Sequence, residues 1–297
     1  MSFLGKSHVG LNLRIYAPKA ELVSKTVEQV VGVIKRARGM CVGGENVFSR
    51  IDVLVQSDPR YIDCDCGKTA DALTYRLRNT GTSEVGTRVA NITHGDLYVG
   101  ANNEGIRMQR EAGMDYSMFL SPGLLDYFVE ENMALIVEAL NRGVLAAGIA
   151  MEPFVNSVME GRLLDTFDIW RIESLMSIGG YDPLAAQPTK VEKARKETSP
   201  LFSIEHDQVS GADEYVYTYA GVEEMIPLIR LARKYGACIA PIIPAVKGGW
   251  TIQYDPDVVR RERLKIISKE SRQRRVCVVE GVTFDFIWNG VMPEYRK

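Results

Sequence analysis

The segment AGMDYSMFLSPGLLDYF, residues 112–128, carries an apolar run that ends at Ser121-Pro122-Gly123. The run is typical of a buried strand, and in α/β proteins ligands usually bind at the carboxyl end of such a strand. Serine offers a neutral hydroxyl there, glycine has no side chain, and proline lacks a backbone N–H donor. The nearest acid, Asp126, is either a metal ligand or a solvated residue at a helix start. The strand end itself therefore supplies no carboxylate for a divalent metal ion.

Cysteine and histidine are few and widely spaced. The cysteines are Cys41, Cys64, Cys66, Cys238 and Cys277, and the histidines are His8, His94 and His206. The close pair at 64 and 66 has no second pair at zinc-finger spacing. Reduced thiols are the expectation, and a metal site at the close pair is the alternative.

The bulk composition is that of an ordinary globular protein. The chain has 297 residues, of which 46% are hydrophobic and 25% charged, enough to build a large core. Its formal net charge of -2 gives no overall attraction to nucleic acid or to anionic membranes. No apolar stretch reaches the roughly 20 residues that cross a bilayer, and the first residues lack a secretory apolar segment. We therefore expect a soluble, cytoplasmic protein with no transmembrane segment and no nucleic-acid partner.

Hydrophobic periodicity predicts alternating strands and helices in the first half of the chain. Strands are expected at 9–17, 50–58, 87–93, 115–121 and 144–151, and helices at 21–37, 68–78, 103–112 and 124–143, the last capped by Gly143. In the first helix, Leu22, Thr26, Val30 and Val33 are expected to share the core face. This order predicts a three-layer α/β/α sandwich with a mostly parallel central sheet, whose post-strand loops gather at one edge.

The second half is less regular. A helix that ends near Gly236 and a buried strand are expected within residues 221–244. The charged stretch at 189–198, between Pro188 and Pro200, is expected to be exposed and mobile. Since no repeat or low-complexity linker interrupts the chain, we expect one domain over residues 1–297.

Five segments, in order, resemble the family 2 glycosyltransferases. They are LRIYAPKAELVSKTVEQVV, IDVLVQSDP, GANNEGIRMQREAGMDYSMFLSPG, MSIGGYDP and GVEEM. The resemblance covers about two-thirds of the chain and implies the GT-A fold of nucleotide-diphospho-sugar transferases. It divides the chain into a nucleotide-binding half, 1–150, and an acceptor-side half, 151–297, with an inserted region and a basic tail.

On the donor side, the resemblance implies that Asp58 accepts hydrogen bonds from the nucleotide base or ribose. An ordinary turn aspartate before Pro59 is the alternative. Asn102 and Asn103 would contact the nucleotide from the helix entrance, unless they are N-cap residues. Ser121 stands at the strand end where the family usually has Asp-x-Asp.

A cation could replace the metal of that motif. Lys247, in a Gly-flanked loop, could stabilise the diphosphate, as could Arg107 or Arg110, but a surface loop or a solvated helix face explains each equally. Manganese or magnesium would otherwise depend on Asp126, water and the donor phosphates. We therefore assign no metal ligands.

For inverting transfer, a carboxylate must take the proton of the acceptor hydroxyl. Glu223 and Glu224 match the family's acidic pair, although the helix dipole also explains glutamates in a first turn. About 40 residues separate GGYD from GVEE, more than in the family, which makes Asp182 a rival.

The basic tail, 260–275, is either an amphipathic helix that binds an acidic acceptor, a lipid phosphate or a nucleic acid, or a solvated helix that covers the sheet. The resemblance implies a nucleotide-sugar donor and a carbohydrate or lipid-linked acceptor. The leading hypothesis is a metal-independent glycosyltransferase. The alternative is a catalytically silent relative that binds a nucleotide or glycan, and a nucleotidyltransferase ranks third because no Walker-type loop is present.

Overall fold

The structure is a computed structural model. It describes residues 7–16, 18–56, 65–78, 86–92, 97–150, 163, 166–182, 188–190, 215–217, 223–246, 276–283 and 286–296. No helix in these ranges is long and apolar enough to cross a membrane.

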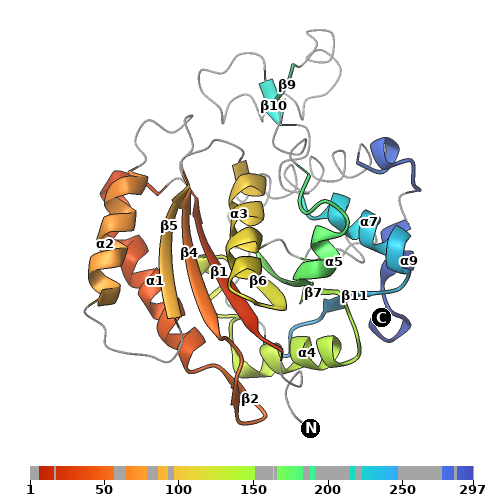
Figure 1. The fold of residues 1–297 in the computed structure, drawn as a ribbon, viewed down its shortest axis with the longest axis horizontal. Helices are drawn as coiled ribbons and strands as arrows, with labels where there is room; N and C mark the ends of the chain where they lie inside the picture. The colour runs from red at the N-terminus through yellow and green to blue at the C-terminus, as the bar shows by residue number, and fades with distance from the viewer. Residues whose placement is uncertain are drawn as a thin grey trace, which may run out of the picture.

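A seven-stranded sheet forms the centre of the protein, in the order β11-β7-β8-β6-β1-β4-β5 (Figure 1). Its strands are β1 (Val9–Tyr16), β4 (Arg50–Gln56), β5 (Gly86–Ile92), β6 (Tyr116–Leu120), β7 (Ala146–Ile149), β8 (Phe167–Arg171) and β11 (Ile239–Ile242). Every neighbouring pair is parallel except those that involve β8, which runs antiparallel to β6 and to β7. The predicted α/β architecture with a mostly parallel sheet is confirmed.

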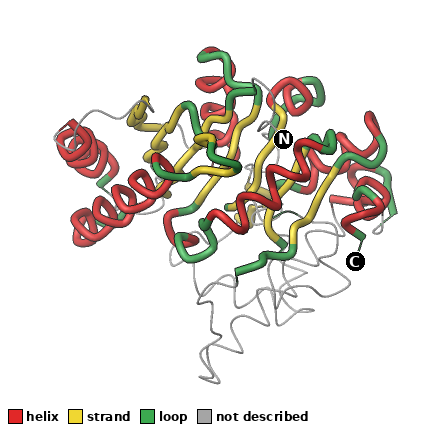
Figure 2. The backbone as a smooth tube through the Cα atoms, turned by 90° about the horizontal axis from the view of Figure 1, so that it is seen from below, coloured by secondary structure: helices red, strands yellow, loops and turns green. Residues whose placement is uncertain are grey.

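Helices cover both faces of this sheet, as the view turned by 90° also shows (Figure 2). The main ones are α1 (Val23–Arg38), α2 (Cys66–Arg78), α3 (Leu97–Glu111), α4 (Glu130–Asn141), α5 (Ile172–Met176), α7 (Met225–Tyr235) and α9 (Phe286–Gly290). Buried side chains of α1, α2 and α4 pack with Leu11, Val53 and Met118 on one face. Those of α3, α5, α7 and α9 pack with Phe119 and Trp170 on the other. Two cores therefore sandwich the sheet.

Smaller elements complete the described chain. Two hairpin-like pairs lie outside the main sheet, β2 (Cys41–Val42) with β3 (Glu45–Asn46), and β9 (Pro188–Lys190) with β10 (Tyr215–Tyr217). The 3-10 turns are η1 (Ala20–Leu22), η2 (Pro122–Leu124) and η5 (Pro293–Tyr295). Residues 276–280 are also helical.

Alternation along β1 explains the two-sided sheet. Val9, Leu11, Leu13 and Ile15 face the first core, while Gly10, Asn12 and Arg14 point to the opposite face, toward α3. Nearly all residues of β1 are buried. A strand covered on both faces is typical of a parallel sheet.

The helix predictions differ from the structure in three details, one of which is that α4 begins at Glu130, six residues after the predicted start at 124. Leu22 is 43% exposed because it belongs to the 3-10 turn before α1, and the buried stripe of α1 runs instead through Val23, Val27 and Val30. Helix α3 begins at Leu97, six residues before the predicted start at 103. Gly143 and Gly236 follow α4 and α7 with positive φ, +88° and +74°, as expected for residues that end a helix.

The carboxyl ends of β1, β4, β5, β6, β7 and β11 meet at one edge of the sheet because these strands are parallel. We call this the carboxyl edge. The start of β8 lies there too, since Phe167 pairs with Leu120. Helices α3 and α7 each run away from this edge, so their first turns lie beside it (Figure 1).

Candidate functional site

Helix α3 packs on the sheet through small and polar side chains. Asn12 Nδ2 donates to Ser117 Oγ at 2.9 Å, and Arg14 Nη1 donates to Asn102 Oδ1 at 3.0 Å. All four residues are buried. A Cβ on Gly105 would lie 2.8 Å from the Asn12 amide, so α3 approaches β1 closely only because glycine stands there. These contacts fix the second and third turns of α3 against β1.

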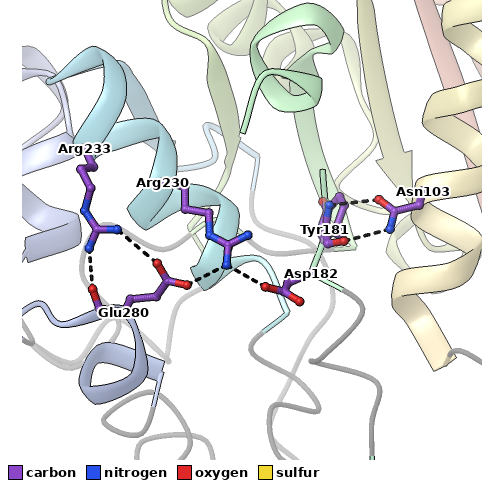
Figure 3. A network of polar contacts seen from close by, with 6 residues as sticks. All are labelled: Asn103, Tyr181, Asp182, Arg230, Arg233 and Glu280. Atoms are coloured by element: carbon purple, nitrogen blue, oxygen red, sulfur yellow. Dashed lines mark hydrogen bonds and ion pairs between the residues drawn. The ribbon is translucent and has the colours of Figure 1, made fainter. Parts of the chain in front are cut away.

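Asn103 holds the turn that follows α5. Its Oδ1 accepts from the Tyr181 backbone N–H at 3.0 Å, and its Nδ2 donates to the Tyr181 carbonyl at 2.9 Å (Figure 3). Gly180 makes the approach possible: its φ is +72°, and a Cβ there would lie 2.9 Å from Asn103 Oδ1. The Gly-Gly-Tyr-Asp turn is therefore anchored to α3 through one amide group.

The side chain of Tyr181 continues inward to the sheet. Its ring packs edge-on against Phe119 and Trp170, at centroid distances of 5.9 and 5.7 Å. Its hydroxyl donates a long hydrogen bond, 3.4 Å, to Asp168 Oδ2 on β8. Tyr181, Trp170 and Asp168 are fully buried, so this cluster anchors the turn that carries Asp182.

Helix α7 brings the acidic pair to the same edge. Glu223 and Glu224 directly precede the helix, and each is only 1% exposed. Arg230, further along α7, donates from Nη2 to Asp182 Oδ2 at 2.7 Å. The Asp182 turn is thus joined by a direct ion pair to α7, the helix that begins directly after the acidic pair.

Arg230 also pairs with Glu280, at 2.9 Å. Burial lowers the pKa of Arg230, but the hydrogen bonds and charges of Glu280 and Asp182 outweigh that effect and raise it above its ordinary value. The guanidinium therefore stays charged at any pH at which the protein is folded.

The predicted donor-side residues within the described ranges lie on α3 and directly after β6. Asn102 and Asn103 lie inside α3, in its second turn, and not at its entrance, because the helix starts at Leu97. Ser121 follows β6, and its backbone N–H donates to the Thr166 carbonyl at 2.9 Å. Asp126 is exposed. Phe119 on β6 packs against Tyr181, and Tyr181 belongs to the turn that Asn103 holds. Asn103 and Ser121 therefore lie at the same edge.

Arg107 and Arg110, the other two candidate cations, lie in the second half of α3, away from its first turn at the carboxyl edge. Arg107 forms ion pairs with Glu104 and Glu111 on its own helix. Arg110 pairs with Glu173 at the start of α5, which follows the end of β8 at the opposite edge. Since α3 descends from the carboxyl edge, Arg110 lies about 10 Å along the helix below Asn103.

Several predicted residues lie outside the described ranges. They are Cys64, Asp58, Lys247, residues 191–198 of the charged stretch and the basic tail 260–275. Within the described ranges, no group of three or more His, Cys, Asp or Glu side chains could hold a metal ion.

Sequence reasoning missed Arg14, Asp168, Arg230 and Glu280, and it treated Tyr181 only as part of a motif. A signal existed for two of them. Arg14 interrupts the apolar pattern of a central strand, and Asp168 interrupts that of β8. A charged residue inside a fully buried strand requires polar partners, which indicates a polar site nearby.

Comparisons with known proteins add little to this description. No protein-family model matches the sequence, and no curated protein sequence matches it. Among solved structures, the mannosyltransferase PcManGT from Pyrobaculum calidifontis, in complex with GDP-Man and Mn2+, is similar with a TM-score of 0.39 and 10% identity. A cytidylyltransferase from Leptospira borgpetersenii serovar Hardjo-bovis (strain JB197) is similar with a TM-score of 0.36 and 13% identity.

The two alignments cover 59% and 58% of this chain, and 48% and 63% of the respective structures. This chain therefore spans about half of the first structure and somewhat less than two thirds of the second. Similarity at this level carries no argument about activity, substrate or metal. The class of the protein, an α/β sandwich with a mostly parallel sheet, rests on its own strands.

Proposed function

We propose that this chain is a glycosyltransferase of GT-A type that moves a sugar from a nucleotide-diphospho-sugar to an acceptor. The observation that carries the proposal is the ion pair that joins the Gly-Gly-Tyr-Asp turn to α7, the helix that begins directly after Glu223 and Glu224. The turn is bound to α3 by Asn103 and to α7 by Arg230, so the proposed donor and acceptor sides share one framework. The resemblance in sequence supports the same assignment.

In the proposed reaction, an acceptor hydroxyl oxygen attacks the anomeric carbon of the sugar. The bond from that carbon to the diphosphate oxygen breaks, and the nucleoside diphosphate leaves with the electron pair. Glu223 or Glu224 takes the hydroxyl proton. General bases of this kind contribute about 10²–10⁴-fold to the rate. Both glutamates are excluded from water, which strengthens their interaction with a bound proton donor.

Asp182 is the weaker candidate for the base. One of its carboxylate oxygens already accepts a hydrogen bond from Arg230 at 2.7 Å. A guanidinium holds a carboxylate in a fixed geometry, and this favours an anchoring role over proton transfer. We therefore assign the base to the glutamate pair.

On the donor side, we propose that Asp58 contacts the base or ribose, that Asn102 and Ser121 line the nucleotide site, and that Lys247 stabilises the diphosphate in place of metal-bound carboxylates. Asn103 contributes by holding Tyr181. A cation that acts in this way makes nucleotide binding largely independent of manganese.

The test of the activity is donor hydrolysis, because glycosyltransferases slowly transfer sugar to water. A panel of UDP- and GDP-sugars would be incubated with the protein and with Glu223→Gln and Glu224→Gln. We expect one of the two variants to lose at least a hundredfold in rate while its affinity for the nucleoside diphosphate stays within about twofold. Nucleotide binding with no hydrolysis of any donor would instead support the silent relative.

The test of the metal question is calorimetry with UDP and GDP, in manganese and in a chelator. We expect binding in chelator and at least tenfold weaker binding for Lys247→Ala, about 1.4 kcal/mol. Lys234→Ala, at the exposed end of α7, is the matched control and should bind as the wild type does. A tenfold gain in affinity on adding manganese would contradict cation-for-metal replacement.

A further inference from the structure

A four-residue ionic network joins three segments that are distant in the sequence. Arg230 on α7 donates to Asp182, in the turn after α5, and to Glu280, in the helical residues 276–280 (Figure 3). Arg233, almost one turn further along α7, donates from Nη1 to the other carboxylate oxygen of Glu280 at 3.3 Å. Two arginines therefore balance two carboxylates.

The acidic partners are well shielded from solvent. The Asp182 and Glu280 side chains are 11% and 9% exposed, and that of Arg230 is 32% exposed. Partly buried, charge-assisted hydrogen bonds of this kind fix geometry more firmly than surface ion pairs do. The network is therefore a rigid junction between these segments and not a set of exposed surface ion pairs.

This junction continues to the proposed catalytic residues in two directions. Asp182 follows Tyr181, which Asn103 binds through both backbone groups. Glu223 and Glu224 directly precede α7, and the Glu224 carbonyl accepts from the Leu228 N–H at 3.1 Å, so the glutamate pair is fixed to the first turn of the helix that carries Arg230. Helix α7 thus links the Asp182 turn, through Arg230, to the glutamate pair that precedes its first turn.

We propose that Arg230 is a positioning residue that sets the glutamate pair against the Gly-Gly-Tyr-Asp turn, and that Glu280 completes this function from the carboxyl-terminal part of the chain. The inference rests on the proposed function for its catalytic meaning, but the mechanical coupling that it describes exists whether or not the chain transfers sugar. Lysine could not replace arginine fully, because its ammonium group lacks the planar fork of donors that here serves two carboxylates.

Two measurements on Arg230→Met, Arg230→Lys and Arg233→Met test the proposal. In donor hydrolysis, we expect Arg230→Met to lower kcat at least tenfold with KM and nucleotide affinity within about twofold, and Arg230→Lys to recover part of that loss. In amide hydrogen exchange, we expect Arg230→Met to speed exchange in residues 177–182 as well as in 276–283. Arg233→Met is the matched control: it should speed exchange in 276–283 alone and keep a kcat within about twofold of the wild type.

The outcomes separate the two proposals. If the wild type hydrolyses no donor, the proposed function fails, and exchange at residues 177–182 still decides whether Arg230 positions the turn. Unchanged exchange there in Arg230→Met would overturn the inference, as would a wild-type kcat. If Arg230→Met does not fold, Arg230→Lys and Asp182→Asn carry the same test, because each keeps the shape of the junction while weakening the pair.

Discussion

Gln109 is a fully buried amide that faces the sheet from α3. Within the described part of the chain, neither its Oε1 nor its Nε2 has a hydrogen-bond partner, and the side chain fills the space left by the missing Cβ of Gly10. A buried amide without partners costs roughly 1–3 kcal/mol. This residue is thus a weak point of the α3 interface and a place where the chain can be made more stable.

We predict that Gln109→Met raises the free energy of unfolding by about 1 kcal/mol, because methionine keeps the volume and the helix propensity and removes the unpaired amide. Urea denaturation measures the change. Gln29→Met, on the exposed side of α1, is the control and should stay within about 0.5 kcal/mol of the wild type. A clear loss of stability in Gln109→Met would mean that the amide has a partner, such as an internal water.

The Cys238 thiol predicts a dependence of stability on alkaline pH. Burial raises its pKa from 9.0 to about 11. Because the folded state holds the proton more tightly, the stabilisation is fully present below pH 9 and is lost as the pH rises toward 11. We expect the stability advantage of the wild type over Cys238→Ala to shrink by on the order of 1–2 kcal/mol between pH 8.5 and 10.5. An advantage that is equal at both pH values would show that the thiol does not titrate in this way.

At the scale of elements, the seat of α3 on β1 depends on glycine. Asn12 cannot turn away from Gly105 freely, because its Nδ2 is bonded to Ser117. We predict that Gly105→Ala lowers the free energy of unfolding by about 1–3 kcal/mol, since the new methyl group would overlap the Asn12 amide.

The control for Gly105→Ala is Gly32→Ala in α1, where a Cβ would meet nothing within 4 Å. There the same substitution should raise stability by up to about 1 kcal/mol, because alanine has the higher helix propensity. Thermal and urea unfolding of both variants would give changes of opposite sign. Equal changes would show that α3 is free to shift away from the sheet.

The contact between Gly105 and Asn12 also shows what the sequence could and could not predict. Period-two and period-3.6 patterns predicted β1, β4, β5 and β6 and the helices α1 and α2 to within a few residues, because burial on one or both faces dictates those patterns. The start of α3 was missed because Gly100, Asn102, Asn103 and Gly105 are typical of a turn, whereas the structure uses Gly105 for close packing. Tertiary contact overrode local preference.

For the candidate site, sequence motifs predicted the segments but not their partners. Asn103 meets Tyr181 across 78 residues, and Asp182 meets Arg230 across 48. Neither contact has a spacing that a motif could reveal, since each depends on how α3, α5 and α7 pack over the sheet. Strand β8 was also missed, because its five residues pair with neighbours from other parts of the chain.

At the scale of the whole molecule, residues 286–296, the carboxyl-terminal segment, cover the edge of the sheet formed by β11. Val291 bridges to Ile239 on β11, the Met292 N–H donates to the Ile239 carbonyl, and the Cys238 N–H donates to the Gly290 carbonyl. A Cβ on Gly290 would lie 2.5 Å from Ala232 Cβ on α7. The segment therefore protects an edge strand, which otherwise offers unpaired backbone groups to other chains.

We predict that Gly290→Val displaces this segment, lowers the free energy of unfolding by at least about 2 kcal/mol and promotes self-association through β11. Urea denaturation and light scattering measure the two effects. Gly86→Val, in β5, is the control: a Cβ there meets nothing within 4 Å, and valine favours a strand. A monomeric, stable Gly290→Val would show that α7 can move to accept the larger side chain.

The reversed strand β8 has a consequence for the order in which the chain folds. Strands β1, β4, β5 and β6 come from residues 9–120 and are adjacent to one another in the sheet, with β6 alone also pairing with β8, so they can assemble early. Strand β7 borders β8 and β11, both of which come later in the chain, and it has no earlier strand to join. During synthesis β7 must therefore wait for β8, and we expect the loop closure that joins these strands to be the slow step in forming the second half of the sheet. Substitutions in β8 should then slow refolding more than equally destabilising substitutions in β5, which stopped-flow kinetics would detect.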